Sequence, residues 1–367
     1  MRVCDVAIAG GGIVGAACAA ACAAAGLKGV VVEAGVIGGG ATAAGMGHLV
    51  VMDDSPAQLA LTAYSCQLWA ELCATLPPEV EYATCGTIWI AADEEEMAEV
   101  RRKKCLYEGV GVHAEILAPQ ELAEAETNLR PGLAGGLLVT GDAVIYPPCA
   151  ARHLLERARA QGASVLSAFA ADLTNDGIRL RDGSFLAAGF TVDATGAWAQ
   201  GAPGIEIRRR KGHLAITDRY PGYVGHQLVE LGYLKSAHSS TGDSVAFNVQ
   251  PRMTGQVLIG SSRQYGAEDA AVEQPILHRM LQRAIEYMPS LANLSAIRAW
   301  TGFRAATPDK LPLIGPAPGR KRLYLASGHE GLGITTSLAT AKLLVDQFLG
   351  RTPAIPIEPY LPSRCNG

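Results

Sequence analysis

The first stretch of the chain alternates between apolar runs and glycines. Residues 6–27 carry no charged side chain; a short apolar run comes first, followed by three consecutive glycines and an alanine-rich stretch. A second apolar run, 30–32, ends at Glu33. This order predicts a strand, a glycine turn, a helix and a second strand.

Two other interpretations fit part of this stretch. An uncharged run of this length can span a bilayer, but four of its first ten residues are glycine, which disfavours a continuous helix. A cleaved signal peptide would have Arg2 before the apolar run, but Asp5 and the glycine turn fit that pattern poorly. We therefore expect an internal, buried helix in a cytoplasmic protein.

The rest of the chain mixes both periodicities. Apolar residues at helical spacing predict helices over 55–76, 93–107, 149–161, 275–288 and from 335 to 349. Apolar or alternating runs predict strands near 86–91, 165, 178–181, 184–186, 190–192, 245–249, 256–261 and 323–326. Turn residues at 175–177 and 182–183 predict hairpins between the neighbouring strands.

The first predicted elements have the pattern of a dinucleotide-binding unit. Gly10 permits a tight turn, Gly12 lets backbone N–H groups approach a pyrophosphate, and Gly15 lets the helix lie close to the sheet. The phosphates would lie at a helix N-terminus, which favours negative charge. Glu33, roughly 20 residues farther on, would accept hydrogen bonds from ribose hydroxyls and repel a 2′-phosphate. The expected ligand is FAD or NAD, not NADP.

Composition narrows the class further. At 367 residues the chain is long enough for two domains, and its net charge of −4, with both signs interspersed, argues against a nucleic-acid partner. The basic cluster 208–211 is expected to be a solvated loop, although it could face a cofactor or a neighbouring subunit. Nine cysteines lack the spacing that holds zinc or an iron–sulfur cluster, so we expect no metal site.

Four segments together carry a family resemblance: Gly10–Gly15 with Glu33, Ala194–Gly196, Thr301–Asp309 and Gly328–Thr335. In this order they resemble the D-amino-acid oxidase and glycine oxidase type of FAD-dependent amine oxidoreductases, over essentially the whole chain. The last two segments favour FAD over NAD, because a nicotinamide enzyme has no need for them.

The resemblance implies an α/β fold class. A Rossmann-like, glutathione reductase-like FAD-binding domain would be interleaved with an antiparallel-sheet, D-amino-acid oxidase-like substrate domain. The first would comprise residues 1–80, 140–212 and 305–367, and the second 81–139 and 213–304.

The same resemblance implies a set of FAD-binding residues. The glycine-rich stretch 38–49 belongs to it, because many small residues let the backbone press against a flat ligand. The turn at 328–335 would cover the pyrimidine edge of the flavin, although Thr335 and Thr336 could also be ordinary helix N-caps. The full set is Gly10, Gly12, Ile13, Val14, Gly15, Glu33, Ala34, Thr42, Ala43, Ala44, Gly45, Met46, Gly47, Thr195, Gly196, Trp198, His329, Gly331, Leu332, Gly333, Ile334 and Thr335.

The substrate side follows the family only in part. The resemblance implies that Arg304 holds the substrate carboxylate, for which a guanidinium fork is suited; the alternative is a structural salt bridge to Asp309. Where glycine oxidase-like enzymes carry a second arginine this chain has Gly331, and their tyrosine aligns with Asn248. Candidate replacements are His48, Asn248, Gln250 and Arg263, each of which could instead be a satisfied polar residue at a domain interface.

Within the family, 41–54 and 328–333 resemble the flavin subunits of D-hydroxyproline dehydrogenase, hydrogen cyanide synthase and opine oxidase complexes. The likeness implies hydride transfer from an amino acid or secondary amine to FAD, with D-hydroxyproline or D-proline favoured. Electrons would pass to a non-NAD acceptor through partner subunits, which could carry iron–sulfur clusters or a second nucleotide. A glycine- or opine-oxidising subunit, an FAD-holding structural subunit and a nicotinamide dehydrogenase are the alternatives.

Overall fold

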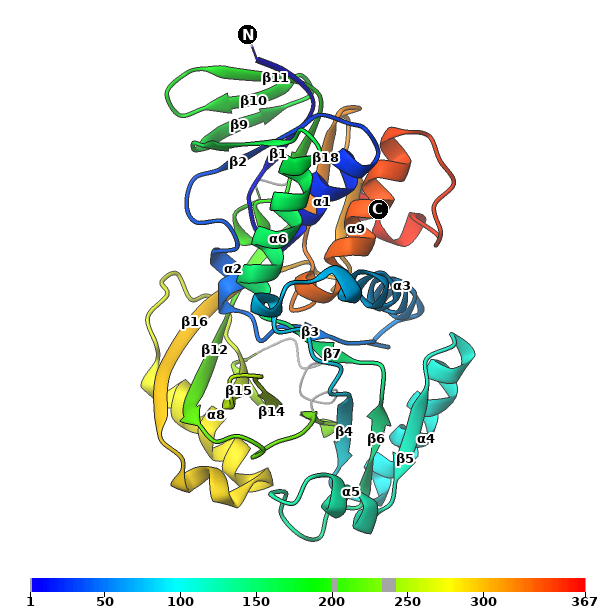
Figure 1. Ribbon diagram of the computed structural model, residues 1–367, viewed down its shortest axis with the longest axis vertical. Coiled ribbons are helices and arrows are strands. Elements are labelled where there is room, and N and C mark those ends of the chain that lie inside the picture. Colours follow the sequence, from blue (N-terminus) through cyan, green and yellow to red (C-terminus); the bar gives the residue numbers. More distant parts are fainter. Residues whose placement is uncertain (1, 200–203, 233–241, 367) are drawn as a thin grey trace.

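The computed structural model describes residues 2–199, 204–232 and 242–366, and Figure 1 shows two large sheets toward opposite ends of its long axis. The predicted opening unit is present as β1 (Arg2–Ala9), α1 (Ile13–Ala24) and β2 (Gly29–Glu33). The two strands pair in parallel. Half of the uncharged run is therefore strand and turn, and α1 has only 12 residues.

The first sheet also contains β8 (Ser164–Ser167), β9 (Ala170–Thr174), β10 (Gly177–Leu180), β11 (Phe185–Asp193), β17 (Leu313–Pro316) and β18 (Leu323–Ser327). Its strand order is β17-β18-β11-β1-β2-β8, with β9 and β10 attached to β11 as antiparallel hairpins. Strands β18, β11, β1, β2 and β8 are parallel, and β17 is antiparallel. β11 is one strand where the sequence predicts two, because Leu186–Ala188 and Phe190–Asp193 both pair with β1.

Helices cover one face of this sheet. They are α1, α6 (Pro147–Ala160) and α9 (Gly333–Phe348), and α3 (Pro56–Leu72) packs against α9. Alanines on α1 pack in one buried cluster with Leu154 of α6 and Leu343 of α9. Because alanine is small, α1 lies close to the sheet while α6 and α9 flank it (Figure 1).

The second sheet has the order β16-β12-β15-β14-β13-β4-β6-β5 and is antiparallel except where β13 meets β4. Its strands are β4 (Thr87–Ala91), β5 (Ala114–Leu117), β6 (Gly135–Val139), β12 (Arg208–Arg219), β13 (Gln227–Glu230), β14 (Ser244–Pro251), β15 (Gln256–Arg263) and β16 (Ala296–Ala306). Helix α8 (Gln274–Tyr287) packs on one face through Met280 and Ala284. Helices α4 (Glu94–Gly109) and α5 (Pro119–Ala125) lie beside β4–β6 (Figure 1).

Short elements lie between the two sheets: α2 (Gly40–Ala44) and the small sheet of β3 (His48–Leu49) and β7 (Ala143–Val144) (Figure 1). The mixed α/β fold class is confirmed. The division into two discontinuous domains stays a prediction, although sheet pairing puts all of β12 with the second sheet.

The solvated loop expected at 208–211 is wrong. These residues begin β12; Arg208 and Arg209 are exposed, whereas Arg210 and Lys211 are buried. Arg210 is buried in an ion pair with Glu330, and Lys211 is buried with Glu273 at 3.0 Å. Arg210 and Lys211 are buried because β12 pairs with β16 and because the two acidic side chains compensate their charges.

In the part of the chain that the structure describes, no helix is both long and apolar enough to cross a membrane.

Candidate functional site

A backbone cradle forms where β1 ends and α1 begins. Gly10 has a φ of +103°, and a side chain there would collide with the carbonyl of Ala194 at 2.5 Å. A Cβ on Gly15 would lie 2.0 Å from the Gly10 oxygen, so only glycine lets α1 approach the turn. The helix N-terminus therefore stands directly over the strand ends, where its N–H groups attract an anion.

Two side chains border this cradle. The Ile13 N–H donates to Thr42 Oγ1 at 3.0 Å, which ties α1 to α2. Glu33, at the end of β2, accepts from the Gly11 N–H at 2.5 Å and the Gly35 N–H at 2.7 Å. Both contacts hold the edges of the cradle in place before any ligand binds. Ala34, the next predicted residue, lies in the same turn after β2.

The glycine-rich segment then passes between the sheets. Gly47 has a φ of +103°, and a Cβ there would lie 2.0 Å from the Ile145 oxygen. Ala44 is pressed against β16: a Cβ on Gly302 would meet its methyl at 2.3 Å, and the Trp300 indole N–H donates to its carbonyl at 3.4 Å. Ala44 and Gly47 thus allow close approach to neighbouring backbone, and contact of this segment with a flat ligand stays a prediction.

One face of the second sheet is turned toward this segment. A Cβ on Gly260 would meet Leu214 and Met46, so this face lies against Met46. Asn248 is in register with Gly260 and projects from the same face. Gln250, two residues on, donates from its amide nitrogen to the Met46 carbonyl at 2.8 Å.

Arg304 reaches this face from β16. Its guanidinium passes over Gly212, where a Cβ would lie 2.4 Å from Nη1, and donates from Nη1 to the Ser262 carbonyl at 2.9 Å. Gly331 lies against the same side chain, since its Cβ position is 3.5 Å from Arg304 Nε. The alternative of a salt bridge from Arg304 to Asp309 is wrong for that carboxylate, which pairs with Arg364 at 2.6 Å.

His48 completes the group from β3. The residue is partly exposed but its Nε2 is buried, and burial lowers the pKa of His48 to about 3. Three buried polar atoms of the group have no aligned hydrogen-bond partner among the described residues: His48 Nε2, Asn248 Oδ1 and Gln250 Oε1. Native interiors rarely leave such atoms unpaired, so the gathering of three indicates a place for a ligand.

The turn before α9 faces the same region. His329 is buried, its pKa is lowered to about 4 by burial, and its Nε2 lies 3.0 Å from Thr340 Oγ1. Glu330 has a φ of +56° and pairs with Arg210, while its N–H donates to the Ala305 carbonyl at 2.8 Å. The turn is thus fastened to both α9 and the second sheet.

The alternative that Thr335 and Thr336 are N-caps is wrong. Helix α9 begins at Gly333, and its N-cap, Leu332, makes no side-chain capping bond. Thr335 Oγ1 instead donates to the His48 carbonyl at 2.8 Å and accepts from Val50 at 3.4 Å. Thr335 therefore connects the last helix to the segment that carries His48.

Two candidate residues lie at the margin of this group. The Trp198 indole is 60% exposed, with the Arg209 guanidinium 4.8 Å from the ring centroid. Arg263 lies at the end of β15, in register with Ser244. Neither is brought against His48 or Asn248 by a contact of the described residues.

Sequence reasoning missed an ionic cluster beneath segment 50–53. Lys103 of α4 is fully buried and pairs with Asp53, while Tyr107 donates to the Val51 carbonyl at 2.8 Å. Asp142 Oδ1 accepts from the Val51 N–H at 3.3 Å, and burial raises the pKa of Asp142 to about 7. Lys103 lies in a highly charged helix, and nothing in the local sequence distinguishes it as a buried lysine.

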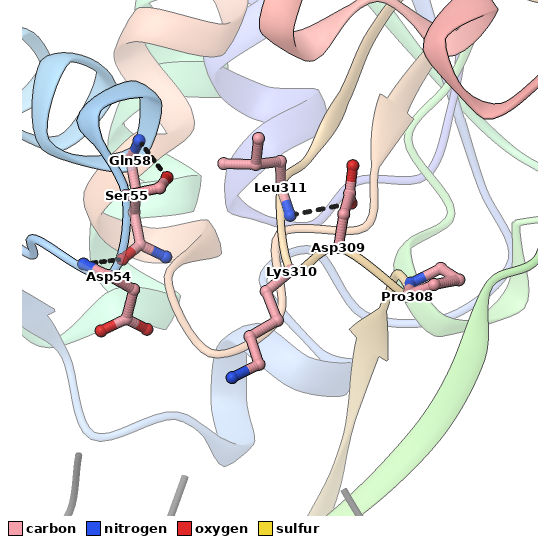
Figure 2. A pocket seen from close by; sticks show the side chains of 7 residues that line it. All are labelled: Asp54, Ser55, Gln58, Pro308, Asp309, Lys310 and Leu311. Carbon is pink, nitrogen blue, oxygen red and sulfur yellow. Dashed lines mark hydrogen bonds between the residues drawn. The ribbon is translucent and has the colours of Figure 1, made fainter. Parts of the chain in front are cut away.

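A surface pocket of about 240 Å³ lies elsewhere, between the start of α3 and the loop 308–311 (Figure 2). The side chains around it include Asp54, Gln58 and Lys310. None of the residues predicted for the cofactor or the substrate lines it. In the described ranges, no group of His, Cys, Asp and Glu is arranged to hold a metal ion.

Comparisons with known proteins agree on one family. Residues 5–347 match the family described as FAD dependent oxidoreductase. The glycine oxidase of Geobacillus kaustophilus is 27% identical over 97% of this chain and 96% of its own, and the hydrogen cyanide synthase subunit HcnC of Pseudomonas aeruginosa is 24% identical over 99% and 96%.

Solved structures show the same likeness. The crystal structure of the Geobacillus kaustophilus glycine oxidase superposes with a TM-score of 0.87 over 99% of both chains. The L-proline dehydrogenase from P. horikoshii, 22% identical, superposes with a TM-score of 0.87 over 100% of this chain and 98% of its own, which shows the fold alone.

Proposed function

Because the chain belongs to the FAD dependent oxidoreductase family, we propose that it oxidises an amino acid or secondary amine at the carbon that bears nitrogen, giving the imine. One observation carries the proposal: Arg304 and Asn248 lie on one face of the second sheet, and Asn248, Gln250 and His48 each have a buried polar atom with no aligned hydrogen-bond partner among the described residues. A cation for a carboxylate and acceptors for N–H or O–H groups suit an amino acid.

The residues present fit FAD. Gly10, Gly12 and Gly15 leave room at the N-terminus of α1 for a pyrophosphate, and Glu33 ends β2 where a ribose would lie. Residues 42–47 and 329–335, with Thr195 and Gly196, would border the flavin ring. FAD, when bound, supplies a two-electron acceptor for the hydride of the substrate carbon.

The chain's own side chains would bind and orient the substrate. Arg304 would hold the carboxylate through its guanidinium fork. His48 and Asn248 would line the amine side, where each offers a polar atom that has no aligned partner in the part of the chain that the structure describes. Because burial lowers the pKa of His48 to about 3, this imidazole is a hydrogen-bond partner and not a store for the amine proton. The substrate must therefore deliver its amine unprotonated.

D-Hydroxyproline or D-proline is the favoured substrate in this proposal. Gly331 and Asn248 replace the second arginine and the tyrosine of glycine oxidase-like enzymes, so the substrate side differs from theirs. The solved structure named L-proline dehydrogenase has the same fold, and proline is a cyclic secondary amine. Oxidation of glycine or of an opine is the alternative.

We propose further that electrons leave through partner subunits. The likeness to a hydrogen cyanide synthase subunit supports an assembly. An FAD-holding subunit without chemistry of its own is the competing function, and the Arg304 face argues against it. A cytoplasmic location stays a prediction.

The deciding experiment follows the flavin absorbance of the purified protein without oxygen. Glycine, both proline enantiomers, the hydroxyprolines and opines are each added in turn. We expect a cyclic D-amino acid to bleach the flavin. Bleaching by glycine or by an opine alone would show that this compound, and not a cyclic D-amino acid, is the substrate. If no compound bleaches the flavin, the result would favour an FAD-holding structural subunit. Dye reduction exceeding peroxide yield would mark a dehydrogenase, whereas stoichiometric peroxide would mark an oxidase.

A further inference from the structure

Gly212 is a buried glycine in the interior of β12, where a strand ordinarily carries a side chain that packs. Glycine weakens such a position, because it contributes no packing and loses the most conformational entropy on folding. The backbone does not require glycine there either, since φ of Gly212 lies outside the left-handed region. The reason for this glycine therefore lies in what occupies the space where a side chain would stand.

That space is occupied by the guanidinium group of Arg304. A Cβ on Gly212 would lie 2.4 Å from Nη1, 2.8 Å from Cζ and 2.9 Å from Nη2 of Arg304. These three are the atoms nearest to that position, so the guanidinium group lies directly over the glycine. The charged end of the arginine and a side chain at residue 212 exclude each other.

Two further contacts define the path of this arginine. Arg304 Nη1 donates to the Ser262 carbonyl at 2.9 Å, and Ser262 is itself held because its Oγ accepts from the His213 N–H at 2.8 Å. On its other side, the Cβ position of Gly331 is 3.5 Å from Arg304 Nε. Arg304 thus starts on β16, crosses β12 and reaches β15, and this path is open only while residue 212 has no side chain.

We propose that Gly212 is a positioning residue that sets where the guanidinium group of Arg304 stands for the substrate carboxylate. The use of that group rests on the proposed function. The atoms that an added side chain would displace are the far end of a flexible side chain, whereas at Gly15 the obstructing atom is a backbone oxygen. An alanine at residue 212 should therefore cost little stability, and its cost should appear in substrate binding.

The position of the guanidinium group is tested first, in crystal structures of the substrate-free wild-type and Gly212→Ala holoenzymes. We expect Arg304 Nη1 to leave the Ser262 carbonyl in the variant. The melting temperature should fall by no more than about 2 °C, and the flavin content should stay that of the wild type. Gly29→Ala is the matched control, because it also replaces a strand glycine but its Cβ meets nothing within 4 Å.

Two results of this first test would overturn the inference. One is a Gly212→Ala structure in which Arg304 still bonds to the Ser262 carbonyl. The other is a variant that does not fold, because the strain would then have fallen on the backbone and not on the guanidinium group.

Flavin reduction without oxygen supplies the second measurement. Gly212→Ala should raise KM for the amino acid about tenfold, the loss of one hydrogen bond to a charged group, with a smaller change in the limiting rate. In Arg304→Met, which has no guanidinium group to displace, the same substitution should change KM less than about twofold. Equal effects in both backgrounds would show that Gly212 does not act through Arg304.

The inference and the proposed function can fail separately. If no amino acid reduces the flavin, the proposed function is refuted, and the crystal structures still decide whether Gly212 places Arg304. If the guanidinium group moves and KM stays unchanged while an amino acid does reduce the flavin, the positioning role in substrate binding is refuted and the proposed oxidation stands.

Discussion

The cradle at the start of α1 and the proposed substrate face, which comprises His48, Asn248 and Arg304, are built by different means. The cradle consists of backbone: Gly10 and Gly15 matter because they have no side chains, and the helix N-terminus provides the attraction. The substrate face consists of side chains, with His48, Asn248 and Arg304 arriving from three separate strands. A site made of close-packed backbone has no room for an added side chain, whereas in a site made of side chains one residue can be replaced by another.

This difference implies that the two regions fail in different ways. Damage to the cradle should remove the cofactor and destabilise the fold, since the same close approach packs α1 on the sheet. Damage to the substrate face should change kinetics and leave the flavin bound. Gly15→Val and Arg304→Lys separate these two failures, and two further changes probe the buried ionic cluster beneath segment 50–53.

The largest effect is expected from Gly15→Val. Its Cβ would lie 2.0 Å from the Gly10 oxygen, so α1 must move off the turn, at a cost of about 3 kcal/mol or more. We expect a colourless protein with a lower melting temperature, measured by visible absorbance and thermal unfolding. Gly29→Ala is the control, because a Cβ there meets nothing within 4 Å. A yellow Gly15→Val protein with the melting temperature of the wild type would contradict the assignment of the cradle as the cofactor site.

Next comes Lys103→Met, beneath the segment that carries His48. Burial lowers the pKa of Lys103 despite its partner Asp53, which shows how costly the buried charge is. Removing the cation strands the carboxylate and should cost about 3 kcal/mol in urea unfolding. Arg102→Met removes the half-exposed cation from the same carboxylate and should cost less than about 1 kcal/mol. Equal losses would show that burial of Lys103 is unimportant.

Arg304→Lys should break the substrate face alone. A single ammonium cannot reproduce the guanidinium fork, so KM for the amino acid should rise about 10- to 100-fold, or about 1.4–2.7 kcal/mol. Flavin content should stay that of the wild type. Arg322→Lys, in an exposed ion pair with Asp176, is the control. Unchanged kinetics would remove Arg304 from the site.

The last effect depends on pH and accumulates gradually over the range in which one carboxyl group titrates. Burial raises the pKa of Asp142 from 3.8 to about 7, so the folded protein keeps a proton that the unfolded chain releases. The stability that this carboxyl contributes is complete below pH 3.8 and is lost as the pH rises to about 7, at up to about 1.4 kcal/mol per pH unit. The stability of the wild type relative to Asp142→Asn should fall over that range and then level off. Asp176→Asn, an exposed carboxylate, should give a far smaller change; equal slopes would contradict the prediction.

Local signals predicted the cradle and most elements well. The glycine spacing, the second strand and Glu33 lie close together in sequence. The helices predicted from residues 55 and 93 are present as α3 and α4, with Ser55 and Asp93 as their N-caps. The basic cluster shows the limit. Arg210 and Lys211 are buried because Glu330 and Glu273 meet them from distant elements, and no local pattern records those partners.

The sequence by itself determined the dinucleotide-binding unit, the α/β class and the family, because these depend on residue types at short spacing. Only the tertiary structure decided that Gln250 donates to the Met46 carbonyl, that Thr335 binds the segment 48–50 instead of capping α9, and that Lys103 is buried. These contacts join residues far apart in the chain. Their partners are chosen by strand register and by packing between the two sheets, which no short window of sequence contains.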